Sequence, residues 1–276
     1  MTITIFWIRH GYSCANIHKY IHAKIRDPHL TYDGLECSEK SKQFVPTQVD
    51  YILCSSLKRA METALAMYPP KIIDKTKDKK IISVPYIGEK GFGLDNTCST
   101  YKTLIKYFES FGTKTFLDLK YHDPKSKHYK KMSDEPNIAN FFNFLSTVIL
   151  KKKNNNENIN IAIVTHSHFM AHNNICEINK KKKVKPNNNS IFKIIYNEPF
   201  KKMADIHARP INKKKIIKIY DGCDFNKKNP IKLSCHKKQK TCKKNPIETG
   251  KKYYRCSTKK FSILNNIKFR TLFNTP

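Results

Sequence analysis

The sequence has no run of about 18 consecutive apolar residues, so we expect no transmembrane helix. It also lacks the basic segment that opens a secretory signal peptide, because its first apolar stretch leads directly into Arg9 and His10. No internal repeat is visible. The chain has 276 residues, of which 39% are hydrophobic and 27% are charged. That is enough for one large domain, or for one domain with a sizeable appendage.

The nine cysteines include no CxxC pair. Without such pairs or a signal peptide, we expect free thiols in the cytoplasm or another reducing compartment, and not a secreted protein. The cysteines and histidine that a zinc site near the C-terminus would use are Cys223, Cys235, His236, Cys242 and Cys256. The cysteines are separated by eleven, six and thirteen residues, which match no usual zinc pattern.

Acidic residues are scarce: 22 Asp and Glu stand against 53 Lys and Arg, which gives a net charge of +31. Residues 201–276 alone hold 22 basic and 4 acidic residues, a net charge of +18. Such a field attracts polyanions, which include nucleic acid, acidic membrane surfaces and phosphorylated substrates. The chain is also rich in Lys, Asn and Ile together, as the codon bias of an AT-rich genome would produce. Both explanations of the charge stay open.

Apolar runs typical of buried strands alternate with helical patterns as far as residue 197. The expected strands are 2–8, 49–54, 81–84, 158–164 and 190–196, and the expected helices are 13–24, a stretch ending near Phe44, 57–68, 101–111 and 133–150, the last beginning at Ser133–Pro136. This order predicts an α/β fold, with a doubly wound, mainly parallel central sheet and helices on both faces. Residues 198–276 form a Lys-rich, basic C-terminal extension of uncertain structure, in which 216–220 is one short strand candidate. The pattern does not settle the conformation of residues 90–132.

Polar residues follow four of the predicted strands. Arg9 and His10 end the first, and Arg59 lies in the helix after the second. Glu89 follows the third, and His166 follows the strand at 158–164. Because the carboxyl ends of parallel strands share one edge of a sheet, we expect these side chains to converge there. Two arginines and two histidines would bind an anion, and the carboxylate could move a proton.

Four motifs around these residues resemble those of the histidine phosphatase superfamily, which includes the phosphoglycerate mutases and many acid phosphatases. They occur in the expected order over residues 1–197. They are R-H-G with a later Asn (Arg9, His10, Gly11, Asn16), L-T-x-x-G (Leu30, Thr31, Gly34), S-x-x-x-R-A-x-x-T-A (Ser55, Arg59, Ala60, Thr63, Ala64) and V-T-H (Val164, Thr165, His166). Glu89 and Gly93 also match the E-x-x-x-G of the family.

The resemblance implies a phosphomonoesterase that forms a phosphohistidine on His10. In that case Glu89 donates and accepts the proton, with Asp95 as the substitute. Arg9, Arg59 and His166 would hold the phosphoryl group. The substrate-binding set that the resemblance implies also includes Gly11, Asn16 and Ser167. Neither a metal nor a cofactor is required. The substrate would be a phosphorylated small molecule or a phosphoprotein.

The mutases carry a Gly-Trp segment between their first histidine and the L-T-x-x-G turn. Residues 17–29 contain no Trp, so we favour a phosphatase over a phosphoglycerate mutase. A different class of function stays open. The core could be catalytically vestigial, with a structural or polyanion-binding role through residues 201–276, for example in the particle of a large DNA virus. The intact pair of Arg9 and His10, together with Arg59 and His166, argues against a dead site. Substrate and oligomeric state stay open.

Overall fold

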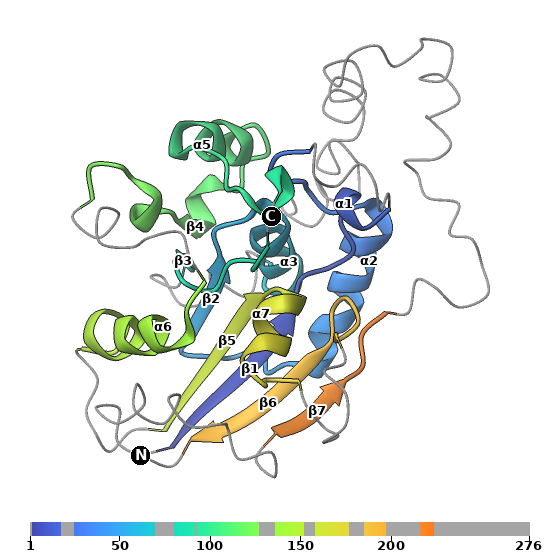
Figure 1. The fold of residues 1–276 in the computed structure, drawn as a ribbon, viewed down its shortest axis with the longest axis vertical. Coiled ribbons are helices and arrows are strands. Elements are labelled where there is room, and N and C mark those ends of the chain that lie inside the picture. The colour runs from blue at the N-terminus through green and yellow to red at the C-terminus, as the bar shows by residue number, and fades with distance from the viewer. Residues whose placement is uncertain are drawn as a thin grey trace.

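A central sheet organises the computed structural model, which describes residues 2–17, 25–69, 80–91, 93–126, 136–151, 158–176, 185–196 and 216–223. Its strands follow the order β4-β3-β2-β5-β1-β6-β7 (Figure 1). Their bounds are β1 (Ile3–Arg9), β2 (Tyr51–Ser55), β3 (Ile81–Val84), β4 (Leu117–Asp118), β5 (Ile159–Thr165), β6 (Ile191–Tyr196) and β7 (Ile216–Tyr220). β1 to β5 pair in parallel, whereas β6 and β7 are antiparallel. The predicted α/β fold with a mainly parallel sheet is confirmed.

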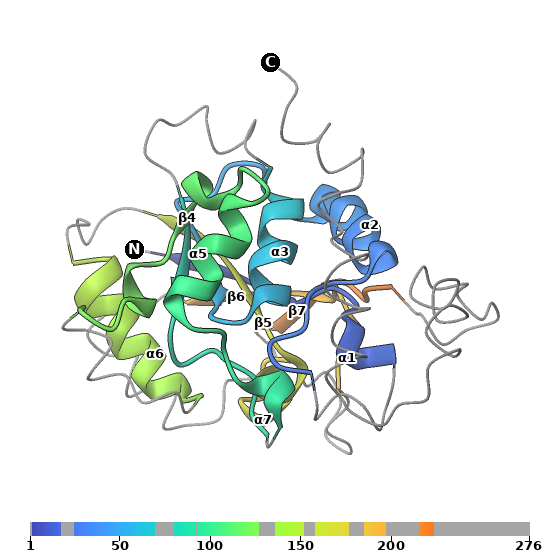
Figure 2. The same cartoon turned by 90° about the horizontal axis from the view of Figure 1, so that it is seen from above.

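Helices cover both faces of this sheet (Figure 2). They are α1 (Cys14–Ile17), α2 (Tyr32–Ser41), α3 (Lys58–Met67), α5 (Tyr101–Glu109), α6 (Ile138–Phe144) and α7 (Ser167–His172). Shorter helical turns are η2 (Lys42–Phe44), η3 (Leu94–Asn96), η4 (Lys114–Phe116) and η5 (Lys120–His122), and the π-helical turn η7 (Leu145–Ile149) extends α6. α6 and α7 pack on one face and α3 and α5 on the other, which makes the sheet doubly wound.

Strand β1 is buried on both faces because helices cover the sheet on both sides. Ile5 and Trp7 point toward α6 and α7, while Phe6 and Ile8 point toward α3 and α5. Successive side chains of a strand alternate between faces, so a strand sandwiched in this way has a continuous apolar sequence. The Trp7 ring lies in edge or tilted contact with three phenylalanine rings: Phe141, Phe142 and Phe169. These contacts fix the strand that ends in Arg9 and His10.

Two of the predicted helices differ from those observed. Helix α6 begins at Ile138, where the Asn137 side chain caps it by accepting the N–H of Asn140. Pro136 therefore precedes the helix, so the prediction that the helix begins at Ser133–Pro136 is wrong for Pro136. Residues 131–135 lie outside the described part of the chain. The predicted helix 13–24 is described only as α1, since residues 18–24 are not described. The two-residue strand β4 was not predicted, because it falls in the ambiguous segment 90–132.

Part of the predicted C-terminal extension belongs to the sheet. β7 pairs with β6, and Cys223 just beyond it forms a disulfide with Cys37 of α2. The expectation of free thiols is therefore wrong for these two cysteines, and Cys223 is not available as a zinc ligand. The other zinc candidates, and all of residues 201–276 except 216–223, lie outside the described residues. In the described part of the chain, no helix is both long and apolar enough to span a membrane.

Gly222 and Cys223 bring the end of this segment against the turn before β6. Gly222 has a φ of 83°, and a Cβ there would lie 2.2 Å from the carbonyl oxygen of Asn188. The N–H of Cys223 donates to that same oxygen at 2.9 Å. A side chain at position 222 would break this approach, so the glycine is required. The disulfide holds the segment in place.

We expect Cys37→Ser to lower the free energy of unfolding by about 2–5 kcal/mol, because the disulfide closes a loop of 186 residues. Denaturant unfolding of the oxidised protein measures the loss. A dithiol reductant should destabilise the parent protein equally and leave the double variant Cys37→Ser, Cys223→Ser unchanged. A parent protein that does not respond to the reductant would contradict the disulfide.

Candidate active site

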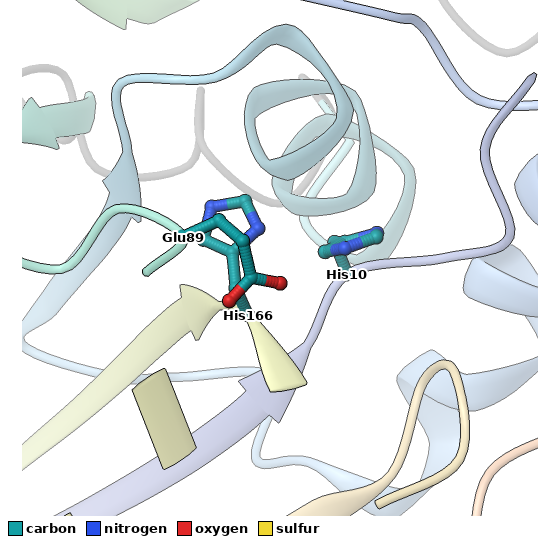
Figure 3. Close-up of side chains that lie close together, drawn as sticks. All are labelled: His10, Glu89 and His166. Carbon is teal, nitrogen blue, oxygen red and sulfur yellow. The ribbon is translucent and has the colours of Figure 1, made fainter. Parts of the chain in front are cut away.

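The register of β1 against β5 places the two motif histidines side by side. Arg9 is the partner of Thr165 in this parallel pair, so His10 and His166 leave adjacent strands at the same level. Their ring centroids lie 4.9 Å apart with an interplanar angle of 57°, and both side chains are almost completely buried. Figure 3 shows the Glu89 side chain beside them. Convergence at the carboxyl edge is therefore observed.

Hydrogen bonds fix the tautomer of His10. Its Nδ1 lies 2.7 Å from the carbonyl oxygen of Gly11, which can only accept, so Nδ1 carries the proton. The other ring nitrogen, Nε2, receives the Nε–H of Arg59 at 3.3 Å. The Nε2 lone pair therefore faces the arginine rather than a carbonyl. An imidazole held in this way presents a nucleophilic nitrogen to an anion bound at the same place.

Burial keeps both histidines neutral. The pKa of His10 lies well below its ordinary value of 6.5, first because of burial and then because Arg59 and Arg9 are close. Burial also lowers the pKa of His166, with further contributions from Arg59, His10 and Arg9. Protonation would place another cation beside two guanidinium groups in a dry site. His10 is therefore available for attack at neutral pH.

Arg59 is held in one orientation by three acceptors. Besides His10, its guanidinium donates to the carbonyl oxygen of Asp95 at 2.6 Å and to Oδ1 of Asn96 at 3.2 Å. The guanidinium of Arg9 donates to the carbonyl oxygen of Pro186, and its buried Nε has no hydrogen-bond partner in the part of the chain that the structure describes. Burial lowers the pKa of Arg9 to about 10, so both arginines stay charged at neutral pH. An oxyanion would supply the missing acceptor and charge.

His166 has one nitrogen held and one left for a ligand. Its Nε2 lies 2.7 Å from Oγ of Ser55, at the end of β2. Ser55 Oγ also accepts the N–H of Leu57 at 3.4 Å, and its own hydroxyl hydrogen can be donated to Nε2. With that donation the ring proton lies on Nδ1, a buried atom with no hydrogen-bond partner among the described residues. This nitrogen can donate to a phosphoryl oxygen.

Glu89 approaches the histidines from the loop after β3. A carboxylate oxygen of Glu89 and one ring nitrogen each of His10 and His166 lie within 4.8 Å of one another. Oε1 of Glu89 accepts the backbone N–H groups of Lys90 and His168, both at 3.1 Å, which orients the carboxylate. The alternative acid, Asp95, lies in η3 and contacts Arg59 through its backbone carbonyl. Its buried Oδ1 has no hydrogen-bond partner among the residues described.

Three further predicted site residues have structural contacts. A Cβ on Gly11 would lie 2.7 Å from the carbonyl oxygen of Gly34 and 2.6 Å from Oγ of Ser38. The absence of a side chain at Gly11 therefore allows these two residues of α2 to pack closely against it. Oδ1 of Asn16 accepts the N–H and the hydroxyl of Ser13 and thereby caps α1. Ser167 is buried as the first residue of α7, beside His166.

Asp27 positions Arg59 but was not among the predicted site residues. One carboxylate oxygen of Asp27 accepts the N–H of Lys58 at 2.8 Å, at the start of α3. The other accepts the N–H of Ser99 at 2.9 Å, and the N–H of Asp27 donates to Leu94 at 3.2 Å. Asp27 thus ties α3 to the 94–99 segment that holds the guanidinium. The signal in the sequence was only a turn-forming Asp-Pro pair.

Two polar side chains outside the predicted set of site residues support the backbone at His10. Oγ1 of Thr63 accepts the N–H of Gly11 at 2.9 Å, and the side-chain amide of Asn188 donates to the carbonyl oxygen of His10 at 3.0 Å. Thr63 belongs to the S-x-x-x-R-A-x-x-T-A motif, so the motif could have identified it as a residue that supports the site. Asn188 lies in the Pro-Asn-Asn-Asn-Ser run before β6, which indicated only a turn.

His10, Glu89 and His166 could also ligate a metal, since imidazole and carboxylate groups are common ligands. The charges beside them favour a different occupant. Arg9 and Arg59 both act electrostatically on His10 and lower its pKa, and they would repel a cation at the same place. The arrangement therefore suits an oxyanion better than a metal ion.

The neutral histidines should make stability fall with acidity. His10 and His166 have folded pKa values well below 6.5, and His122 has a pKa lowered to about 4 by burial. Below pH 6.5 the unfolded chain takes up protons that the folded protein does not, so each histidine costs about 1.4 kcal/mol per pH unit. Above pH 6.5 this loss is absent.

Urea unfolding of the parent protein and of His10→Asn, between pH 5 and pH 8, tests this. The difference in unfolding free energy between the two should be constant above pH 6.5 and should shift in favour of the variant below it. A difference that is independent of pH across the whole range would contradict the buried, neutral state of His10.

Comparison with known proteins gives a family and a set of similar folds. The sequence pattern of the histidine phosphatase superfamily (branch 1) matches residues 5–198. No curated protein matches the chain. Among solved structures, phosphoserine phosphatase from Entamoeba histolytica is 21% identical, covers 69% of this chain and 89% of its own, and has a TM-score of 0.38. Phosphoglycerate mutase from Bacillus anthracis is 16% identical, with 71% and 88% covered and a TM-score of 0.44.

The ecdysone phosphate phosphatase from Bombix mori, crystallised with tungstate, is 13% identical, with 69% and 88% covered and a TM-score of 0.45. The family assignment does not rest on these low-identity likenesses. It rests on the pattern match, which spans most of the chain and includes all five of the candidate site residues: Arg9, His10, Arg59, Glu89 and His166. The chain belongs to the histidine phosphatase superfamily, branch 1.

Proposed function

We propose that this protein is a phosphomonoesterase that works through a phosphohistidine on His10. The observation that carries the proposal is the state of the His10 ring, in which Nδ1 donates to Gly11 and Nε2 faces Arg59. A neutral, oriented imidazole beside two arginines meets the requirements of a nucleophile toward a phosphate ester. Membership of the superfamily supports phosphoryl transfer of the phosphatase or mutase type.

In the first step, Nε2 of His10 attacks phosphorus and the bond from phosphorus to the ester oxygen breaks. The new N–P bond leaves a positive charge on the ring, which the Nδ1–H bond to the Gly11 carbonyl stabilises. The phosphoryl oxygens receive hydrogen bonds from Arg9 and Arg59 and from Nδ1–H of His166. These donors are already in place before the reaction, so little reorganisation is needed.

The protonated carboxyl group of Glu89 gives its proton to the departing alkoxide. In the second step its carboxylate takes a proton from water, whose oxygen attacks phosphorus as the N–P bond breaks. Inorganic phosphate leaves and His10 returns to its neutral state. Glu89 suits this role because it lies close to both histidines and its Oε1 is held by two backbone N–H groups.

Release of the phosphoryl group to water, rather than to a second substrate, is the part of the proposal that separates a phosphatase from a mutase. The absence of the mutase Gly-Trp segment from residues 17–29 supports hydrolysis. The substrate is a phosphorylated small molecule or a phosphoprotein. The competing proposal is that the core is catalytically vestigial and that the protein binds polyanions through residues 201–276. Only the positive charge of that segment supports it.

We expect His10→Ala to abolish release of phosphate from p-nitrophenyl phosphate, and Glu89→Gln to slow turnover by about 10²–10⁴-fold with an alkyl phosphate. The loss in Glu89→Gln should be much smaller with p-nitrophenyl phosphate, because its leaving group departs without a proton. Initial rates with both esters, for both variants and the parent protein, give the measurement.

Asp95→Asn is the matched control, since it makes the same change of carboxylate to amide at the alternative acid. It should show no such dependence on the leaving group. If Asp95→Asn shows the dependence and Glu89→Gln does not, the acid has been assigned to the wrong carboxylate. A parent protein without turnover between pH 4 and pH 8 would favour the vestigial role instead.

A further inference from the structure

A cavity of about 510 Å³ lies directly beside the proposed acid. Glu89 forms part of its wall, and so does Asn96, whose side chain holds the guanidinium of Arg59. Its volume is within the range of cavities that bind small organic molecules. The oxygen that Glu89 protonates carries the organic part of the substrate. This cavity is therefore where that part can lie while phosphorus faces His10.

Three tyrosines give the cavity an aromatic wall. Tyr86 and Tyr121 both line it, and both rings rest edge-on against Phe144, with centroids 6.5 Å and 4.9 Å from it. Tyr101, the first residue of α5, lines it as well. Because Phe144 packs against the Tyr86 and Tyr121 rings, these rings offer a fixed surface for a planar group of the substrate. Edge or offset contacts between aromatic rings are favourable.

Tyr86 is held in an unusual backbone conformation. Its φ is 67°, in the left-handed region that large side chains rarely adopt. Its carbonyl oxygen accepts the N–H of Asn137 at 2.9 Å, which ties this strained residue to the start of α6. A conformation of this kind persists only where the surrounding structure holds the residue in place. Here it places a tyrosine ring in the cavity wall next to Glu89.

Charge in the cavity is sparse and balanced. Among the described lining residues, Arg26 and Glu89 are the charged side chains, one of each sign. His122 also lines the cavity, and burial lowers its pKa to about 4, so it is neutral at neutral pH. Its Nε2 is 2.6 Å from Oγ of Ser83. The cavity therefore offers little positive charge to bind a second phosphate group. An uncharged ring can enter it without the cost of removing water from a charged group.

We propose that this cavity binds an aromatic ring of the leaving alcohol, and that the preferred substrates are therefore phosphate monoesters of alcohols that bear an aromatic ring. This inference rests on the proposed function, since it assigns the leaving group of that reaction. The inference predicts selectivity among esters, whereas the proposed function predicts turnover itself.

The test compares three esters of primary alcohols: ethyl phosphate, 2-phenylethyl phosphate and 2-cyclohexylethyl phosphate. Their leaving groups are of similar acidity, so differences in rate report binding of the organic group. With the full-length protein, kcat/KM for the phenyl ester should exceed that for the ethyl ester by about 10- to 100-fold, the range expected for burial of one phenyl ring. The cyclohexyl ester should lie between them.

Tyr101→Leu and Tyr86→Leu should each reduce the ratio of kcat/KM for the phenyl ester to kcat/KM for the cyclohexyl ester. Tyr32→Leu is the matched control, because Tyr32 lies in α2 and does not line the cavity. It should keep the full preference.

Equal kcat/KM for the ethyl and phenyl esters would overturn the inference and leave the proposed function standing. Turnover of none of the esters, with no phosphate on His10, would overturn the proposed function. Binding to His10→Ala gives a measure that needs no turnover. 2-Phenylethylphosphonate should bind at least 10-fold more tightly than ethylphosphonate, and equal affinity would overturn the inference by itself.

Discussion

The parallel pairing of β1 with β5 is the constraint on which the rest of the site depends. Its register sets Arg9 opposite Thr165, so the next residue on each strand is a histidine and the two rings meet at one edge of the sheet. The pairing is stable because β1 is apolar on both faces and is packed between helices. A shift by one residue would turn every side chain of β1 to the opposite face. The apolar core thereby determines where His10 lies.

The same burial that stabilises the sheet gives the site its chemistry. Away from water, the pKa of each histidine is lowered and the rings stay neutral, while the two arginines keep their charge and lack full compensation. Such a site is poorly suited to cations and well suited to a dianion that brings acceptors for Arg9 and His166. The carboxylate of Glu89 is less buried and is oriented by backbone N–H groups. In the proposed mechanism, binding, attack and proton transfer thus belong to separate groups.

Much of this arrangement could be predicted from the sequence because it depends on local patterns. Apolar runs located six of the seven described strands, and motif residues at their ends located the two histidines, Arg9, Arg59 and Glu89. What could not be predicted depends on contacts between distant segments. Asp27 acts through Lys58 and Ser99, and Asn188 acts through the backbone of His10. The disulfide between Cys37 and Cys223 likewise joins residues far apart in sequence. No periodicity in the chain indicates such pairings.

Direct detection of the covalent intermediate tests the central claim. The parent protein is mixed with a labelled phosphate monoester, quenched within one turnover, digested and analysed by mass spectrometry. The account predicts phosphate on the peptide that contains His10, stable in base and labile in acid, and longer-lived in Glu89→Gln. Turnover without any phosphorylated His10 peptide, or with phosphate on His166 instead, would contradict the assignment of His10 as the nucleophile.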